Sequence, residues 1–164
     1  MTSSPLSRIF PMLTLVAGAV ALDQVIKWLV ETKLPFHELV PVIPMIALYR
    51  TWNEGIAFSL LQGLPDTGLI VLTALVIAFV TYLWWRTPPE RSIAHLGYAL
   101  IIGGAVGNLI DRAVYGHVVD YILFHTETWS FAVFNLADSF ISVGAGLIVL
   151  DELLTTIRDR KTRK

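Results

Sequence analysis

Four long apolar stretches divide this chain, and their length constrains its fold more than any other feature. They cover residues 9–30, 68–85, 93–110 and 131–150. Each holds about 18 to 22 residues, which as an α-helix is enough to cross a hydrocarbon core of roughly 30 Å. We therefore expect one membrane domain, residues 1–164, whose spanning helices lie at about 9–30, 68–85, 93–110 and 131–153.

The composition agrees with a membrane protein and excludes several other classes. Hydrophobic residues make up 55% of the 164 residues, charged residues only 15%, and the mean hydropathy is +0.66. A soluble domain of this size is more polar. The 12 basic and 13 acidic residues nearly balance, whereas a nucleic-acid-binding protein normally has a strongly basic face. Without cysteine, the chain has no disulfide, thiolate nucleophile or cysteine-ligated metal.

The segment between the first two apolar stretches is predicted to lie outside the membrane. Residues 35–65 are too polar and too rich in proline and glycine for a further crossing. They contain two strand-like pieces, VPVIPMIALYRTW and IAFSLL, which predict a small sheet or ribbon at about 36–63, lying against the bilayer. Trp52 and Phe58 are candidate interfacial anchors in this sheet. The expected fold class is thus a membrane all-α bundle of four helices with a small extramembrane β region.

Small residues in the third and fourth apolar stretches predict close helix packing. Gly103 and Gly107 form a GxxxG step in the third stretch, and the fourth contains Ser142, Gly144 and Gly146. Small residues at such spacing let two membrane helices approach closely.

The distribution of basic residues predicts which side of the membrane each end occupies. With four spans, eight basic residues fall on the side of the termini and four on the other: Arg8, Arg86, Arg91, Arg158, Arg160, Lys161, Arg163 and Lys164 against Lys27, Lys33, Arg50 and Arg112. Basic residues concentrate on the cytoplasmic side, so both termini are expected there. An alternative makes residues 1–21 a cleavable signal peptide, because Arg8 precedes an apolar run with small residues at Ala17, Ala19 and Ala21.

Polar residues gather near the predicted outer interface, and Asp138 is the most unusual of them. If the fourth helix began at Phe131, Asp138 would lie roughly 10 Å along it. An ionisable group at that depth is costly, which favours a functional site, although an ion pair with Arg112 is the structural alternative. Asp120 lies in the apolar run VVDYIL. Two carboxylates that converge in a site of low dielectric share a proton, so that one acts as a base and the other as an acid.

Other catalytic chemistries find little support in the sequence. The four histidines, His37, His95, His117 and His125, are scattered and form no HExxH motif for a metal. Neither GxSxG nor SxxK surrounds the serines. The phosphate-binding pattern GxxxxGK[ST] is also missing from the sequence, which argues against an ATP-driven pump. We therefore expect neither a metal nor a cofactor.

Four segments of the chain resemble a known family. DQVIK (23–27), TWNEGIAFSLL (51–61), GGAVGNLIDRAVYGHVVDYI (103–122) and FAVFNLADSFISVG (131–144) are similar to blocks of lipoprotein signal peptidase, or signal peptidase II, and occur in the same order. The resemblance implies a bacterial inner-membrane aspartic endopeptidase with four transmembrane helices and a periplasmic β-cradle. Its substrates would be prolipoproteins carrying a diacylglyceryl-modified cysteine, cut just before that cysteine, and the cyclic peptide globomycin would inhibit it.

The resemblance also assigns site residues by position. Asp120 in VVDY and Asp138 in FNLADS match the catalytic pair, and the family's site-shaping polar residues match Asp23, Lys27, Asn53, Gly55, Asn108, Arg112 and Asn135. Structural interpretations remain beside these. Asp23 and Lys27 have the i,i+4 spacing of a helix-end ion pair worth a few tenths of a kcal/mol. Asn108 and Arg112 share that spacing and would face the helix of Asp138. Tyr121 stands where the family most often has phenylalanine.

Two other functions use the same acids differently. A small proton-coupled transporter or channel subunit would use Asp120 and Asp138 as a proton relay and would depend on a membrane gradient. A non-catalytic membrane scaffold would use them only for assembly. A peptidase, in contrast, is expected to cleave its substrate in detergent.

Overall fold

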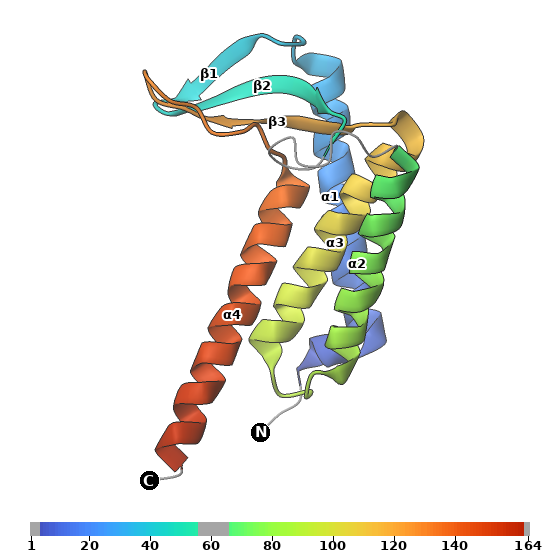
Figure 1. Ribbon diagram of the computed structural model, residues 1–164, viewed down its shortest axis with the longest axis vertical. Coiled ribbons are helices and arrows are strands. Elements are labelled where there is room, and N and C mark those ends of the chain that lie inside the picture. Colours follow the sequence, from blue (N-terminus) through green and yellow to red (C-terminus); the bar gives the residue numbers. More distant parts are fainter. Residues whose placement is uncertain (1–3, 56–65, 163–164) are drawn as a thin grey trace.

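Four helices stand side by side beneath a small sheet (Figure 1). The structure is a computed structural model that describes residues 4–55 and 66–162. A short 3-10 helix, η1 (Pro5–Ser7), precedes the first long helix, and the elements then follow in the order α1 (Ile9–Lys33), β1 (Leu39–Ile43), β2 (Ile46–Asn53), α2 (Asp66–Arg86), α3 (Ser92–Tyr115), β3 (Val118–Phe124) and α4 (Leu136–Thr162). The strand-like piece IAFSLL, with Phe58, lies outside the described residues.

All four long helices are apolar and long enough to cross a membrane, as the sequence predicted. The candidate spans are Ile9–Lys33, Thr67–Arg86, Ser92–Tyr115 and Leu136–Arg160. Their outer faces carry large exposed hydrophobic side chains such as Phe10, Trp28, Leu75 and Val149. Exposed apolar faces on helices long enough to span a bilayer are typical of helices that contact lipid. The chain is therefore a multi-pass membrane protein.

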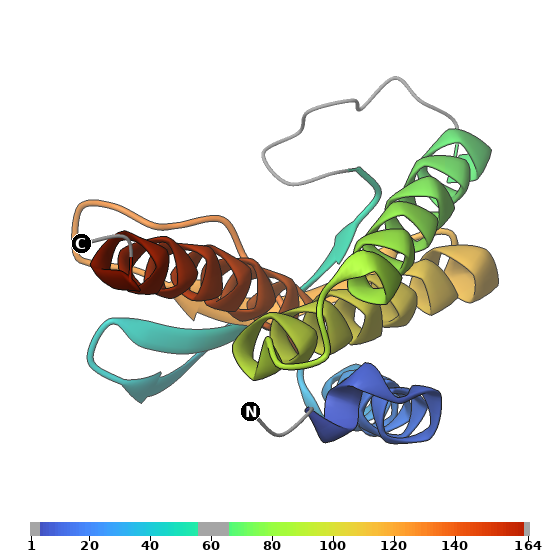
Figure 2. The same cartoon turned by 90° about the horizontal axis from the view of Figure 1, so that it is seen from below.

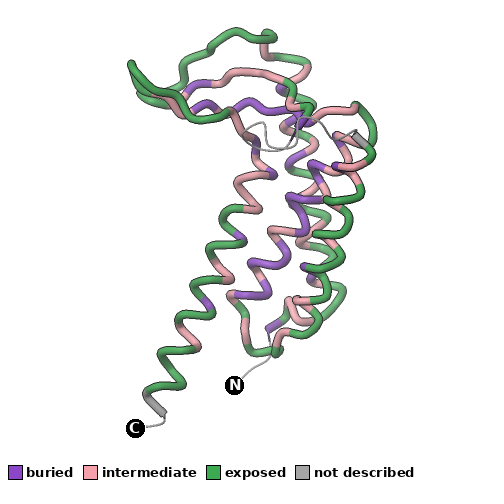
Figure 3. The backbone as a smooth tube through the Cα atoms, viewed as in Figure 1, coloured by how far each residue is buried: buried purple, intermediate pink, exposed green. Residues whose placement is uncertain are grey.

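Helix α3 is the centre of the bundle. Its most apolar window is 61% buried, whereas those of the other three helices are at most 17% buried. Seen from below, α3 lies among α1, α2 and α4 (Figure 2), and buried residues follow it through the bundle (Figure 3). Glycines permit this packing, because a Cβ in their place would be too close to the neighbouring helix. A Cβ at Gly97 would lie 2.6 Å from the carbonyl oxygen of Gly144 on α4, and one at Gly103 would lie 2.8 Å from the Cβ of Ala19 on α1.

The predicted close approach of the third and fourth helices is thus confirmed at Gly144, and Gly103 uses the GxxxG step to contact α1 instead. Gly146 is different, because a Cβ there would meet nothing within 4 Å. Small size at that position therefore serves no helix contact within the described chain.

The sheet has three antiparallel strands in the order β1-β2-β3. VPVIPMIALYRTW, predicted to be a strand-like piece of a small sheet or ribbon, forms most of β1 and β2, which pair as a hairpin with its turn at Pro44 and Met45. β3 pairs with β2 so that Asp120 is opposite Thr51. Beneath it, Val119 and Tyr121 pack with Val30 of α1 in a small apolar core. This core fixes the height of Asp120 relative to the helices.

Strand β3 lies between the third and fourth helices, outside the β region of about 36–63 that was predicted from the sequence. Val118–Tyr121 are all buried, because β2 pairs with this strand at one edge and the helix tops cover its face. Successive strand residues point to opposite faces, so burial of four in a row leaves no alternation of apolar and polar residues to mark the strand. The run VVDYILF has that character.

The fourth helix begins at Leu136 rather than near Phe131, which corrects the sequence prediction. Before it, Phe134 exchanges backbone hydrogen bonds of 2.8 and 3.0 Å with Ile122 of β3, so the segment is extended. Asn135 then caps the helix: its Oδ1 accepts from the backbone N of Asp138 (2.9 Å), and Asp138 Oδ2 accepts from the backbone N of Asn135 (3.3 Å). This reciprocal pattern is a capping box. Asp138 therefore lies in the first turn of α4.

Candidate active site

Asp120 is a buried carboxylate on strand β3. Its exposed fraction is 2%. Asn53 Nδ2, from the end of β2, donates to Asp120 Oδ2 (2.9 Å), and Asn135 Nδ2 donates to Asp120 Oδ1 (2.7 Å). Asn53 is itself oriented, because its Oδ1 accepts from the backbone N of Gly55 (3.0 Å). Side-chain amides from two different elements therefore hold both oxygens of this carboxyl group.

Burial raises the pKa of Asp120 to about 7, and the negative charge of Asp138 adds to the increase. The amides of Asn53 and Asn135 and the charge of Lys27 act in the opposite direction. Desolvation disfavours the ionised form of a carboxyl group, and a nearby like charge does the same. Asp120 therefore exchanges its proton near neutral pH, which suits a general acid or base.

Asp138 faces the same region from the top of α4. Its Oδ1 accepts from Asn108 Nδ2 on α3 (2.8 Å), and its Oδ2 accepts from the backbone N of Asn135. The side chain is half-buried, so it is less enclosed than Asp120. The predicted proximity of Asn108 to the Asp138 helix is confirmed by this contact.

Asn135 joins the two aspartates. Its side-chain nitrogen contacts Asp120, its backbone nitrogen contacts Asp138, and its amide oxygen accepts from the backbone of Asp138. Asn135 is fully buried. One residue thus fixes the position of a carboxyl group on a strand relative to one on a helix.

Lys27 is the centre of a buried charge cluster beside this pair. Its Nζ contacts Asp23 Oδ2 (2.9 Å), Asp111 Oδ2 (2.6 Å) and Asn108 Oδ1 (2.9 Å). The Asp23 and Lys27 side chains are 0% and 4% exposed. The expected i,i+4 ion pair is therefore present, but it lies inside the bundle and is shared with α3. Removing one partner of a buried ion pair typically costs about 3 to 5 kcal/mol, far more than at an exposed helix end.

The first N–H groups of α4 are all used by the site. The backbone N of Leu136 donates to the Tyr121 hydroxyl (3.2 Å), that of Ala137 donates to Asp23 Oδ1 (3.1 Å), and that of Asp138 donates to Asn135. A helix leaves its first N–H groups without partners in its own backbone, and buried ones need other acceptors. Residues from α1 and β3 therefore anchor the helix end that carries Asp138.

Arg112 is positioned toward the end of β2. Its guanidinium donates to the carbonyl oxygen of Gly55 (2.9 Å). Gly55 is also tied to Asn53, which contacts Asp120. All nine residues assigned from the sequence thus belong to a connected region at the top of the bundle.

Asp111 belongs to the network but was not among the predicted site residues. Asp111 contacts Lys27, and its carboxylate also accepts from Gln24 Nε2 (2.8 Å) and from the backbone N of Val119 (3.4 Å). It therefore ties α3 to the strand residue next to Asp120. The i,i+3 spacing of Asn108 and Asp111 places both on one helix face and is the signal that would have identified Asp111.

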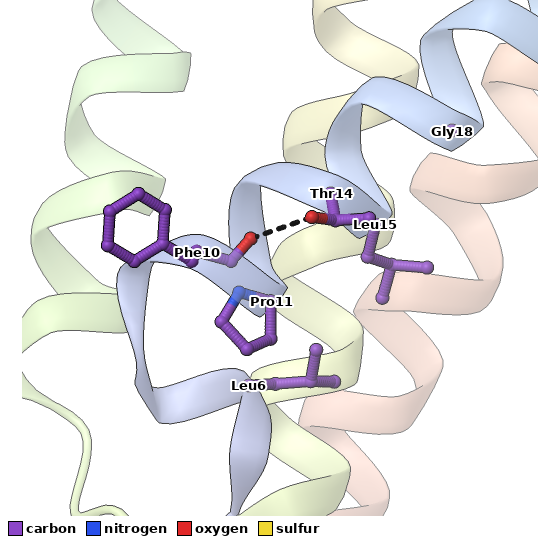
Figure 4. A pocket seen from close by; sticks show the side chains of 6 residues that line it. All are labelled: Leu6, Phe10, Pro11, Thr14, Leu15 and Gly18. Carbon is purple, nitrogen blue, oxygen red and sulfur yellow. Dashed lines mark hydrogen bonds between the residues drawn. The ribbon is translucent and has the colours of Figure 1, made fainter.

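Two pockets in the described part of the chain are lined by neither Asp120 nor Asp138. One, of about 580 Å³, lies on η1 and α1 and is lined by Leu6, Phe10, Pro11, Thr14, Leu15 and Gly18 (Figure 4). Its only side-chain hydroxyl, on Thr14, donates to the Phe10 carbonyl oxygen (3.0 Å). The other, of about 290 Å³, is bordered by Lys27 and Asp111. The described residues contain no group of three histidine, aspartate or glutamate side chains able to hold a metal.

Comparisons with known proteins agree on one family. Residues 15–154 match the family described as Signal peptidase (SPase) II. A protein named Lipoprotein signal peptidase from Sinorhizobium fredii (strain NBRC 101917 / NGR234) is 59% identical over 157 residues, covering 96% of this chain and 95% of its own. One of the same name from Mesorhizobium japonicum (strain LMG 29417 / CECT 9101 / MAFF 303099) is 62% identical over 154 residues, covering 94% and 92%.

Solved structures support the same fold. One described as a bacterial membrane enzyme, solved by the in meso method at 2.3 Å resolution, has a TM-score of 0.82 and 26% sequence identity. The match covers 100% of this chain and 96% of that chain. A second with the same description, at 1.9 Å resolution, has a TM-score of 0.79 and 27% identity, covering 92% and 96%.

Proposed function

We propose that Asp120 and Asp138 are the catalytic pair of this chain, which belongs to the signal peptidase II family. The chain is a lipoprotein signal peptidase, an aspartic peptidase that removes signal peptides from prolipoproteins. This membership favours the peptidase over the proton-coupled transporter and the scaffold, which the sequence alone left open. The finer assignments that follow concern its residues, substrate and orientation.

The observation that carries the catalytic assignment is the double contact of Asn135. It hydrogen-bonds Asp120 through its side chain and Asp138 through its backbone, so the two carboxyl groups are held in a fixed relation. Peptide hydrolysis by an aspartic peptidase needs one carboxylate as base and one carboxylic acid as proton donor. The raised pKa of Asp120 supports a carboxyl group that still holds a proton near pH 7.

The proposed reaction begins with a water molecule between the pair. The ionised carboxylate takes a proton from the water as its oxygen attacks the scissile carbonyl carbon, and the protonated carboxyl group gives its proton to the carbonyl oxygen. The carboxyl group that took the proton from water then gives it to the departing nitrogen as the C–N bond breaks, and a hydroxyl of the tetrahedral intermediate returns a proton to the other carboxylate. The products are a signal peptide ending in a carboxyl group and a lipoprotein with a new amino terminus.

The proposed substrate is a prolipoprotein whose cysteine carries a diacylglyceryl group, cut just before that cysteine. The position of the pair supports this, because Asp138 is in the first turn of a spanning helix and Asp120 is in the strand directly above it. A bond at that height is reached most readily by a peptide anchored in the same bilayer. Globomycin, as a cyclic peptide, is the proposed inhibitor of the same site.

The proposed location is the bacterial inner membrane, with the sheet on the periplasmic side. The helix ends away from the sheet carry Arg8, Arg86, Arg91, Arg158 and Arg160 (Figure 1). Concentrated basic residues mark the cytoplasmic side of a membrane protein. Both termini are then cytoplasmic, and the aspartates lie near the periplasmic face.

The direct test is cleavage by the purified protein in detergent micelles, where no gradient exists. A prolipoprotein with its diacylglyceryl group is incubated with the protein, and mass spectrometry follows the loss of the signal peptide. We expect cleavage at the bond before the modified cysteine and inhibition by globomycin. No cleavage by folded protein, or cleavage at another bond, would reject the proposed substrate assignment.

A further inference from the structure

Lys27 is connected to Asp138 through a single side chain, that of Asn108. We propose that Lys27 is a positioning residue that fixes the direction of the Asn108 side-chain amide and thereby makes Asp138 the base and Asp120 the acid of the pair. This inference rests on the proposed catalytic function of the two aspartates. It goes further by assigning each aspartate a separate task.

The ammonium group of Lys27 can only donate hydrogen bonds. An ammonium group has three donors and no acceptor, and all three here have partners: Asp23 Oδ2, Asp111 Oδ2 and Asn108 Oδ1. The two carboxylates come from α1 and α3 and hold the ammonium group from both sides. Lys27 is 3% exposed, so water does not compete for these contacts.

Lys27 determines which end of the Asn108 side-chain amide faces it. The amide oxygen must point to Lys27, and it also accepts from Asn135 Nδ2 (3.2 Å). The amide nitrogen is then left for Asp138, to which it donates over 2.8 Å. The reverse orientation would place an N–H group against an ammonium ion and an oxygen against a carboxylate. Lys27 therefore excludes it.

Asp138 is consequently an acceptor at both carboxylate oxygens. Oδ1 accepts from Asn108 and Oδ2 accepts from the backbone of Asn135. Hydrogen bonds donated to the charged form of a carboxyl group favour that form. The donor from Asn108 is further polarised because its oxygen is bound to a cation. Asp138 also lies in the first turn of α4, where the helix dipole favours negative charge.

Asp120 has a different environment. It lies on a strand, without a helix end behind it. The two amides that contact its oxygens, those of Asn53 and Asn135, accept from backbone N–H groups through their own oxygens rather than from a cation. It is also the more deeply buried of the two. When the pair shares one proton, the negative charge is therefore best placed on Asp138 and the proton on Asp120. The difference in protonation between the two carboxyl groups therefore originates in the hydrogen bonds that connect Lys27 to Asn108 and Asn108 to Asp138.

The test is a double-mutant cycle between Lys27 and Asn108, read as kcat and KM on a lipidated prolipoprotein. Lys27→Met keeps the length of the side chain and removes the donor, and Asn108→Leu removes the amide. A positioned acid or base contributes about 100- to 10,000-fold to a rate, so we expect Lys27→Met to lower kcat at least about tenfold. KM should change less than about threefold, because the contact acts on the reacting groups.

The combination of the two substitutions separates positioning from mere stabilisation. If Lys27 acts through Asn108, Lys27→Met should lower kcat less than about twofold further in the Asn108→Leu background. A loss of equal size in both backgrounds, or an unchanged kcat in Lys27→Met, would overturn the proposal. If Lys27→Met fails to fold, the same cycle is measured with Asp23→Asn and Asp111→Asn added to both arms, which removes the charges of the two acids that lose Lys27.

A matched control removes the cation of another ion cluster, Arg91. Arg91 contacts Asp151 (2.5 Å) and Glu152 (2.8 Å) at the other end of the helices. Arg91→Met should lower thermal stability and leave kcat within about twofold of the wild type. Asp120→Asn and Asp138→Asn separate the catalytic assignment of the pair from the role of Lys27. If either variant retains cleavage, the catalytic assignment fails. If both are inactive and Lys27→Met is fully active, only the role of Lys27 fails.

Discussion

The side-chain amide of Asn135 donates a 2.7 Å hydrogen bond to Oδ1 of Asp120. Asn135 is also the residue that caps α4, because its oxygen accepts from the backbone of Asp138. The same side chain therefore starts a membrane helix and holds the carboxyl group of a neighbouring strand. The geometry of the proposed catalytic pair depends on a helix cap, which is a local feature of the sequence N-L-A-D.

Replacing either aspartate by asparagine should abolish cleavage and preserve the fold. Asparagine nearly matches aspartate in shape but cannot exchange the proton. Loss of one member of a catalytic unit usually lowers the rate by orders of magnitude. Cleavage rates of Asp120→Asn and Asp138→Asn, with melting temperatures as the control for folding, check this. A variant that retained more than about a tenth of the wild-type rate, equivalent to ~1.4 kcal/mol of barrier, would contradict the assignment.

Activity should decline as pH rises through about 7. The pKa of Asp120 is raised to about 7 by burial and by the charge of Asp138, so above that pH the acid has lost its proton. The rate should then fall about tenfold per pH unit, because only the protonated fraction is active. The measurement is kcat/KM, which reports the pKa of the free enzyme, over the range from about one unit below pH 7 to about two units above it. A rate that continued to increase over this range would show that Asp120 is not the acid.

The same shift affects stability, and its sign is determined by the raised pKa. The native state holds a proton that the unfolded chain, with an aspartate pKa of about 3.9, releases. The contribution of Asp120 to stability is therefore fully present below about pH 4 and is lost as pH rises through about 7. Asp120→Asn should lack this component, so its melting temperature should vary less with pH than that of the wild type.

The helices could be predicted from the sequence, and so could the two aspartates proposed as the catalytic pair, because the signals that single them out are strong and local. Eighteen or more apolar residues define a span whatever their neighbours are. Asp138 was found because an acid beside such a span needs a reason. The beginning of α4 was placed too early because Phe131 to Phe134 are as apolar as a membrane helix. Their pairing with β3 is a tertiary contact.

Lys27 shows what the sequence could not supply. Its i,i+4 spacing with Asp23 predicts an ion pair, and the pair is present. The spacing says nothing about burial, nor about Asp111 and Asn108 from a helix more than 80 residues away along the chain. Only the packing of α1 on α3 converts a common surface pattern into a buried cluster that contacts the site.

Tyr121→Phe should reduce stability slightly and leave cleavage unchanged. The Tyr121 hydroxyl accepts from the backbone N of Leu136, the first residue of α4. Loss of one hydrogen bond typically costs about 0.5 to 1.5 kcal/mol. Burial raises the pKa of Tyr121 to about 12, so the hydroxyl is un-ionised at neutral pH and supplies no charge to the site. Thermal unfolding and kcat of the variant test both statements, and a large loss of kcat would assign Tyr121 a catalytic task.

A reporter of membrane sidedness should place the two ends of the helices on opposite sides. One fused after Lys164, or inserted at Pro88 between α2 and α3, should be cytoplasmic, because the basic residues cluster there. One inserted in the turn between β1 and β2, at Pro44, should be periplasmic. Activity of a periplasmic reporter at the C-terminus would reverse the proposed orientation.

The lipid of the substrate should determine recognition more than the sequence around the cleaved bond. α4 begins at Leu136, so Asp138 lies only about 3 Å along the helix, at a rise of 1.5 Å per residue. The scissile bond must then be held at the edge of the bilayer. Buried acyl chains contribute about 0.8 kcal/mol per CH₂ and fix the height of the cysteine, and holding a bond in register with an acid and a base is a large part of catalysis.

One prolipoprotein, prepared with and without its diacylglyceryl group, should therefore be cleaved at very different rates in the same micelles. We expect the unlipidated form to be cut at least about tenfold more slowly, because loss of the anchor removes both membrane partitioning and register. Trp52, 44% exposed and hydrogen-bonded to Glu31 (3.0 Å), remains a candidate interfacial anchor in the sheet. Trp52→Ala serves as a comparison: if it slowed cleavage while lipidation had no effect, a peptide pocket under the sheet, and not the bilayer, would position the bond.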